Sequence, residues 1–92
     1  MRLDQLLKWS RVIPRRPLAK ATCDAGRVQV NGHPARAGRD IRVGDVVIVR
    51  LPHRVLTFRV VSVPAHAPGK SQARDIIEIQ KTIAIDRLEP DL

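Results

Sequence analysis

The sequence has one cysteine, Cys23, and only two aromatic residues, Trp9 and Phe58, among its 92 residues. A single cysteine excludes an intramolecular disulfide framework and fits a reducing compartment. Because 43% of the chain is nevertheless hydrophobic, we expect a core built from aliphatic side chains. Cys23 and the three histidines show none of the close spacings of metal ligands or of a nucleophilic pair, so we expect no metal, no cofactor and no catalytic residue.

Long apolar segments are also missing, since the longest aliphatic run extends only from Val46 to Val49. A membrane-spanning helix needs roughly 18 or more apolar residues. The N-terminus has a mixed polar pattern in place of the apolar stretch of a signal peptide. We therefore expect a cytoplasmic protein without a membrane partner, and a length of 92 residues allows one compact domain with one activity.

Acidic residues are scarce in the first half of the chain. Residues 1–50 contain eleven Lys or Arg against four Asp, whereas residues 51–92 contain six against five Asp or Glu, so nearly all of the formal charge of +8 lies in one half. Such segregation favours a polyanionic partner over a charge kept for solubility. Without a membrane-binding segment, the favoured polyanion is a nucleic acid.

The spacing of apolar residues predicts two helices near the N-terminus. The first covers about residues 2–11, with Leu3, Leu6, Leu7 and Ser10 on one stripe and Asp4, Gln5 and Lys8 on the other side. The second covers about residues 17–25, with Pro17 in its first turn and Gly26 just past its end. We expect this helix to bury Leu18, Ala21, Thr22 and Ala25 and to expose Arg16, Lys20 and Cys23.

After Gly26 the apolar period changes to two, which predicts strands. The dipeptide Asn31-Gly32 favours a type I′ hairpin turn, and Pro34 restricts the returning strand to a short or edge position. Further strands are expected at about 46–51, after a turn at 43–45, and at about 55–63. Residues 64–72 indicate an exposed loop, and residues 76–79 fit either a strand or a short helix. The expected class is α+β, with two short N-terminal helices packed on a small, mainly antiparallel twisted sheet.

Basic residues are distributed along both predicted helices and the segments that connect them. Guanidinium groups bind phosphates with paired hydrogen bonds and ammonium groups act as mobile charges, so such residues can follow an RNA backbone where they converge. The expected RNA-binding residues are Arg2, Lys8, Arg11, Arg15, Arg16, Lys20 and Arg27. Trp9 either stacks on a base or covers the edge of the core, and Arg36 and Arg39 either extend the RNA surface or lie in a solvated loop.

These segments resemble a known family, the RNA-binding domain named after ribosomal protein S-four, also called the alpha-L motif. The resemblance is carried in order by Met1-Arg2-Leu3-Asp4, Leu7-Lys8, Ser10-Arg11, Arg15-Arg16, Ala19, Gly26-Arg27-Val28, Val30-Asn31-Gly32 and Val43-Gly44-Asp45. Among stand-alone members the chain is similar to the RqcP/YabO-like group of bacterial ribosome-associated quality control. It lacks the basic C-terminal extension typical of the heat-shock protein fifteen group.

The resemblance implies an alpha-L RNA-binding domain over residues 1–63, followed by an exposed loop and a short C-terminal segment over 64–92. It implies a non-catalytic factor, monomeric off the ribosome, that contacts 23S rRNA and peptidyl-tRNA on the split large subunit. Its further partner would be an RqcH-like protein that adds alanine tails to stalled nascent chains. In this family context Asp4 is expected to orient a neighbouring arginine. A heat-shock type recycling or large-subunit assembly factor, and an RNA-binding subunit of an RNA-modifying enzyme, remain alternatives.

Overall fold

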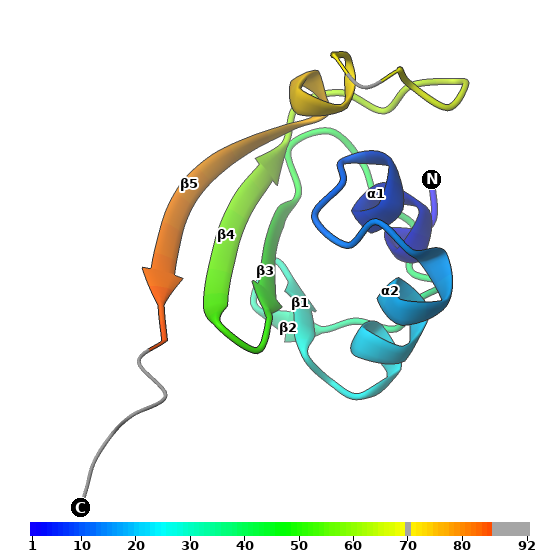
Figure 1. Ribbon diagram of the computed structural model, residues 1–92. Coiled ribbons are helices and arrows are strands. Elements are labelled where there is room, and N and C mark those ends of the chain that lie inside the picture. Colours follow the sequence, from blue (N-terminus) through cyan, green and yellow to red (C-terminus); the bar gives the residue numbers. More distant parts are fainter. Residues whose placement is uncertain (70, 86–92) are drawn as a thin grey trace, which may run out of the picture.

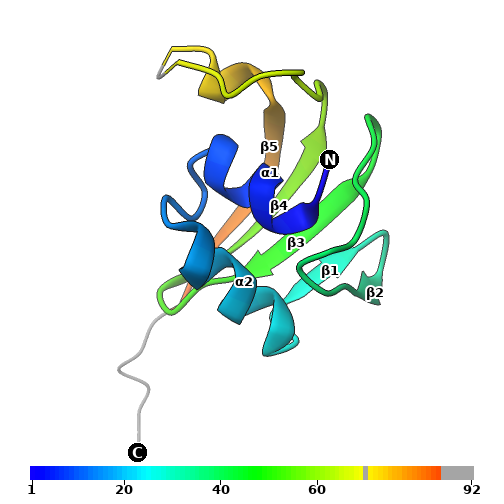
Figure 2. The same cartoon turned by 90° about the vertical axis from the view of Figure 1, so that its right-hand side faces the viewer.

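The computed structural model of the chain describes residues 1–69 and 71–85. Two helices lie on one face of an antiparallel sheet, as Figure 1 shows, and Figure 2 gives the view onto the helical layer. The elements in chain order are α1 (Leu3–Trp9), α2 (Arg16–Asp24), β1 (Val28–Val30), β2 (His33–Pro34), β3 (Val46–Arg50), β4 (Arg54–Val60), the 3-10 helix η1 (Ala73–Asp75) and β5 (Ile77–Ala84). The predicted α+β class and its arrangement of helices on a sheet are confirmed.

The five strands follow the order β2-β1-β3-β4-β5, and every neighbouring pair is antiparallel. Strand β2 is two residues long and lies at one edge, where the missing N–H of Pro34 is tolerated. Strand β5 forms the other edge and pairs with β4 along its length, with one irregularity at Thr57/Phe58. The sequence left open whether residues 76–79 form a strand or a short helix. In the structure β5 begins at Ile77, so this segment is a strand, and it belongs to the same sheet as β1 to β4.

The hairpin between β1 and β2 has the backbone that its sequence predicts. Asn31 and Gly32 have φ angles of 51° and 85°, the positive values that a type I′ turn requires at both central positions. The Asn31 side chain also accepts a hydrogen bond from the Val46 N–H at 3.0 Å and donates one to Asp45 at 3.1 Å. The turn is thereby fastened to the beginning of β3.

The core between the helices and the sheet is aliphatic, as the composition predicts. Helix α1 buries Leu3, Leu6 and Leu7, and the sheet buries alternate residues of β1, β3 and β4 beneath them. In β4 these are Leu56, Phe58 and Val60, which share one face as expected from their period of two. Each such side chain contributes about 1.5–3 kcal/mol when fully buried.

Helix α2 buries a different face from the one predicted. Ala19 and Cys23 are buried, whereas Leu18 is 56% exposed and Ala21 and Ala25 are also exposed. The helical-wheel expectation was wrong because it placed the large residue inside. The small side chains of Ala19 and Cys23 face the core and let α2 pack against α1. Leu18 lies on the exposed side of α2.

Candidate RNA-binding surface

Asp4 is almost fully buried where the start of α1, the start of α2 and the loop after β2 meet, a region that we call the Asp4 corner. The helical wheel predicts it on the polar side of α1, but α2 and the loop after β2 cover that flank. Its carboxylate accepts hydrogen bonds from Arg2 Nε at 3.1 Å, from Arg16 Nε at 3.4 Å and from the Gln5 N–H at 2.9 Å. Asp4 therefore orients two arginines that are distant in sequence, which confirms the role expected for it.

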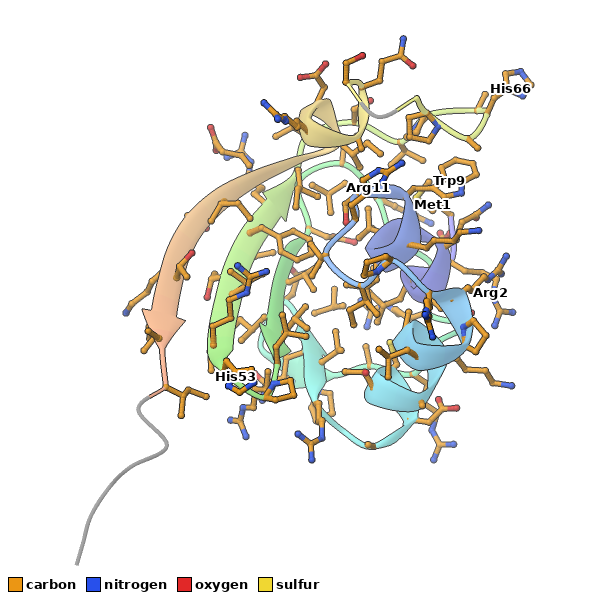
Figure 3. All side chains as sticks on the ribbon, viewed as in Figure 1. Met1, Arg2, Trp9, Arg11, His53 and His66 are labelled. Atoms are coloured by element: carbon orange, nitrogen blue, oxygen red, sulfur yellow. The ribbon has the colours of Figure 1, made fainter. Side chains whose placement is uncertain are left out.

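The two arginines held by Asp4 keep their guanidinium groups at the surface. The side chain of Arg2 is 52% exposed and that of Arg16 is 45% exposed. Figure 3 shows Arg2 on the outer side of the helical layer, close to the start of α2. With their Nε atoms occupied by one carboxylate, both groups present donors to solvent in a fixed orientation, an arrangement suited to binding phosphates.

The loop between β2 and β3 fixes the beginning of α1. The Leu3 N–H donates to the Arg39 carbonyl at 2.9 Å, and the Asp4 N–H donates to the Ala37 carbonyl at 3.1 Å. These bonds satisfy two of the N–H groups that a helix start leaves free. The Arg2 guanidinium lies over Gly38, where a Cβ atom would be 3.7 Å from Nη1. Arg2 is thus held both by Asp4 and by packing on this loop.

The electrostatics of this corner favour a charged Asp4 and an inert Cys23. Burial alone raises the pKa of the Asp4 carboxyl, but the hydrogen bonds and charges of Arg2 and Arg16 outweigh burial and hold the pKa below its ordinary value. Burial, together with the carboxylates of Asp4 and Asp24, raises the pKa of the Cys23 thiol to about 12. Contrary to the expectation from the wheel, Cys23 is a core residue, and its thiol stays protonated.

A second group of predicted residues lies at the end of α1. Lys8, Trp9 and Arg11 border one hollow together with Pro14 and the loop residues 67–68. Figure 3 shows Trp9 and Arg11 beside each other below this loop. Trp9 is half-buried and packs against the core, while Lys8 and Arg11 are exposed. Arg11 has a φ angle of 64°, which turns the chain sharply after the helix.

The remaining predicted residues are exposed at other places on the molecule. Arg15 is the N-cap residue just before α2, and Lys20 lies in the middle of that helix. Arg27 follows α2 and borders a hollow with Arg50, Leu18 and Pro52 at the opposite end of the helix. Arg36 and Arg39 lie in the loop after β2, where Arg39 is close to Asp40 and Asp45. The predicted cations therefore spread over the helices and the loops next to them, and among the described residues Arg2 and Arg16 are the two that share one carboxylate.

Sequence reasoning passed over three further exposed arginines, namely Arg50, Arg54 and Arg74. Arg54 and Arg74 border a hollow with Arg11, and Arg50 borders the one with Arg27. The charge count over residues 51–92 hid Arg54 and Arg74, because five acidic residues nearly balance the six basic ones there. Arg54 could have been found from the alternation of β4, which places it on the same face as Leu56.

Among the described residues, neither helix has the length and apolar character to cross a membrane. Within the same ranges, no three His, Cys, Asp or Glu side chains come together in a group that could hold a metal ion.

Comparison with known protein families identifies the class of protein to which this chain is similar. The S4 domain family matches residues 1–47, the part of the chain that holds α1, α2 and the first hairpin. Two relatives, both named RQC P-site tRNA stabilizing factor, narrow this class to one group of proteins. The one from Halalkalibacterium halodurans is 38% identical over 97% of this chain and 100% of its own length, and the one from Bacillus subtilis is 47% identical over 65% and 70%. The chain therefore belongs to the S4-domain family, within the group that these factors form.

A solved structure supports the fold. The trimeric structure of Vibrio cholerae Heat Shock Protein 15 superposes with a TM-score of 0.80, covering 87% of this chain and 81% of that one at 24% sequence identity. The likeness concerns the fold, which is an S4-type arrangement of two helices on an antiparallel sheet.

Proposed function

We propose that this protein is a non-catalytic RNA-binding factor that stabilises peptidyl-tRNA on the split large ribosomal subunit. In this proposal it contacts 23S rRNA and supports the RqcH-dependent addition of alanine tails to stalled nascent chains, in the cytoplasm. The relatives described above carry a name that refers to the P-site tRNA and to RQC. The protein would act through its basic helical layer and have no reaction of its own.

The observation that carries the proposal is the pair of arginines held by Asp4. A buried carboxylate that fixes Arg2 at 3.1 Å and Arg16 at 3.4 Å reduces the entropy that these side chains lose on binding. Phosphates are the matching ligands for two exposed guanidinium groups. The proposed surface includes Arg2, Arg16, Lys8, Arg11, Arg15, Lys20 and Arg27, with Trp9, Arg36 and Arg39 at its border.

Co-sedimentation tests the proposal with three kinds of large subunit: subunits carrying peptidyl-tRNA, empty subunits and assembly precursors. We expect the protein to sediment mainly with the first kind. Arg2→Ala and Arg16→Ala should each abolish this association while the variants remain folded, as judged by circular dichroism. Arg59→Ala serves as the matched control, because Arg59 is exposed on β4 and lies outside the proposed surface. Ribosome binding by folded Arg2→Ala and Arg16→Ala variants would contradict the proposed surface.

The same experiment separates the alternatives. A recycling or assembly factor would prefer empty subunits or precursors over subunits that carry peptidyl-tRNA. A subunit of an RNA-modifying enzyme would be revealed by modified nucleotides in RNA incubated with the protein and a cell extract. The proposal requires neither result, and its own signature is alanine tailing that depends on both this protein and an RqcH-like partner.

A further inference from the structure

An open hollow of about 420 Å³ lies between the α1–α2 connection and the β4–β5 end of the sheet. Its floor is aliphatic and is formed by Leu56 of β4 with Ile77 and Ile79 of β5. The register of the two strands explains this floor, because Leu56 pairs with Thr82, Phe58 with Ile79 and Val60 with Ile77, all on the face toward the helices. The helices are too short to cover this part of the sheet, as Figure 1 shows.

Three arginines from three separate elements border this hollow. Arg11 comes from the α1–α2 connection, Arg54 from the start of β4 and Arg74 from η1. All three are exposed, and among the described residues none of them has an ion-pair partner. Three cations around one hollow repel one another without an anion between them, so the site favours a negatively charged occupant.

The walls also carry groups that can recognise a polar ring. Ser10 and Thr82 line the hollow. The Ser10 hydroxyl donates to the Leu7 carbonyl at 3.3 Å and keeps its capacity to accept, whereas a threonine hydroxyl such as that of Thr82 can both donate and accept. Its volume of about 420 Å³ lies within the range of about 300–1,000 Å³ that is usual for small-ligand sites. An occupant with one anionic group and one flat, weakly polar ring would match the arginine border and the aliphatic floor together.

We propose that this hollow binds a single unpaired RNA nucleotide, with its phosphate on Arg11, Arg54 and Arg74 and its base over Ile79. Proteins that recognise RNA commonly bind unstacked bases in loops and bulges, where the flat face of any base can lie against the protein. The hollow is continuous with the proposed RNA surface through Arg11, which belongs to both. The inference rests on the proposed function, because that function brings RNA to the protein. It adds a second contact at a different place, with an extruded nucleotide.

The test compares two RNA hairpins with the same stem at low salt, one fully paired and one with a single bulged nucleotide. Fluorescence anisotropy should show about tenfold tighter binding of the bulged hairpin by the wild-type protein. Arg54→Ala and Arg74→Ala should remove this preference and leave the affinity for the paired hairpin unchanged. Arg59→Ala should keep both affinities, because Arg59 lies on the opposite face of β4.

Two isoleucines of β5 provide a second test variant and its matched control. Ile79 and Ile83 are 49% and 47% exposed, but Ile79 lines the hollow and Ile83 pairs with Val55 on the other face. Ile79→Glu should remove the preference for the bulged hairpin, whereas Ile83→Glu should keep it. In methyl NMR spectra, the bulged hairpin should shift the Ile79 resonance and leave the Ile83 resonance in place. A bulge that lacks its base should bind no better than the paired hairpin.

Equal binding of both hairpins by the wild-type protein, or a preference that survives in Arg54→Ala and Ile79→Glu, would overturn the inference. It would also fail if a peptide of alternating glutamate and leucine, and not the bulged RNA, shifted Ile79. Failure of the proposed function has a separate signature. In that case Arg2→Ala and Arg16→Ala would leave the binding of the fully paired hairpin unchanged.

Discussion

Asp4 and Asp40 each receive two cations, yet their surroundings differ. The side chain of Asp4 is 3% exposed and binds Arg2 at 3.1 Å and Arg16 at 3.4 Å. The side chain of Asp40 is 64% exposed and binds the terminal ammonium of Met1 at 3.0 Å and Arg42 at 3.5 Å. The distances are nearly equal, so the two regions show what burial adds to the same kind of ion pair.

Water surrounds the Asp40 cluster and screens its charges, and exposed pairs of this kind contribute little to stability. At Asp4 the low polarity of the surroundings strengthens each interaction and makes an unpaired charge costly. The carboxylate of Asp4 also orients both of its arginines, whereas the side chain of Arg42 is 84% exposed and contacts the exposed Asp40 at 3.5 Å. The buried cluster is therefore the one that combines a stabilising ion-pair network with two oriented arginines of the proposed RNA surface.

The largest expected effect follows from removing the charge of Asp4. Asp4→Asn keeps the shape of the side chain but weakens its hydrogen bonds with Arg2 and Arg16 in a buried place. We expect the free energy of unfolding to fall by about 1–3 kcal/mol, the usual cost of a disrupted buried polar contact. Urea unfolding followed by circular dichroism measures this change.

The matched control is Asp40→Asn, which removes the same charge from the exposed cluster. We expect no measurable change in the free energy of unfolding for this variant. An equal loss of stability in the two variants would show that burial does not separate the two clusters.

The second prediction concerns pH. The cations lower the folded-state pKa of Asp4 below its unfolded value of about 3.9, so ionised Asp4 stabilises the fold at every pH above that value. This stabilisation is lost as the pH falls through the lower, folded-state pKa. The difference in unfolding free energy between the wild-type protein and Asp4→Asn should be constant from about pH 5 to pH 7 and shrink below about pH 4. A difference that stayed constant in acid would assign the effect to shape and not to charge.

The fold was predicted well where side chains alternate with a clear period. The faces of α1 and β4 follow directly from Leu3, Leu7 and Phe58, because large apolar residues there all point to one core. The buried face of α2 could not be found this way. It depends on how closely two helices approach, and this favours the small Ala19 over the larger Leu18.

The site was only partly predictable for a similar reason. The sequence identifies Arg2 and Arg16 as candidates, but the burial of Asp4 between them results from the packing of α2 and of the loop after β2. The convergence of Arg54 and Arg74 depends on the pairing of β4 with β5, which brings residues distant in sequence to one hollow. Such contacts arise from tertiary structure, and neither composition nor periodicity contains them.

The smallest expected effect compares one arginine from each region in its response to salt. Each phosphate contact that is lost should reduce the slope of log affinity against log salt concentration by about 1. Arg16→Ala should show this reduction with a paired RNA hairpin, because Asp4 holds Arg16 at the proposed surface. Arg39→Ala should leave the slope unchanged, since Arg39 shares its hollow with Arg42 and with two carboxylates, Asp40 and Asp45, which lower the local positive potential. A reduced slope for Arg39→Ala would instead extend the RNA surface across the loop after β2, and the Asp40 cluster would then share the role assigned to Asp4.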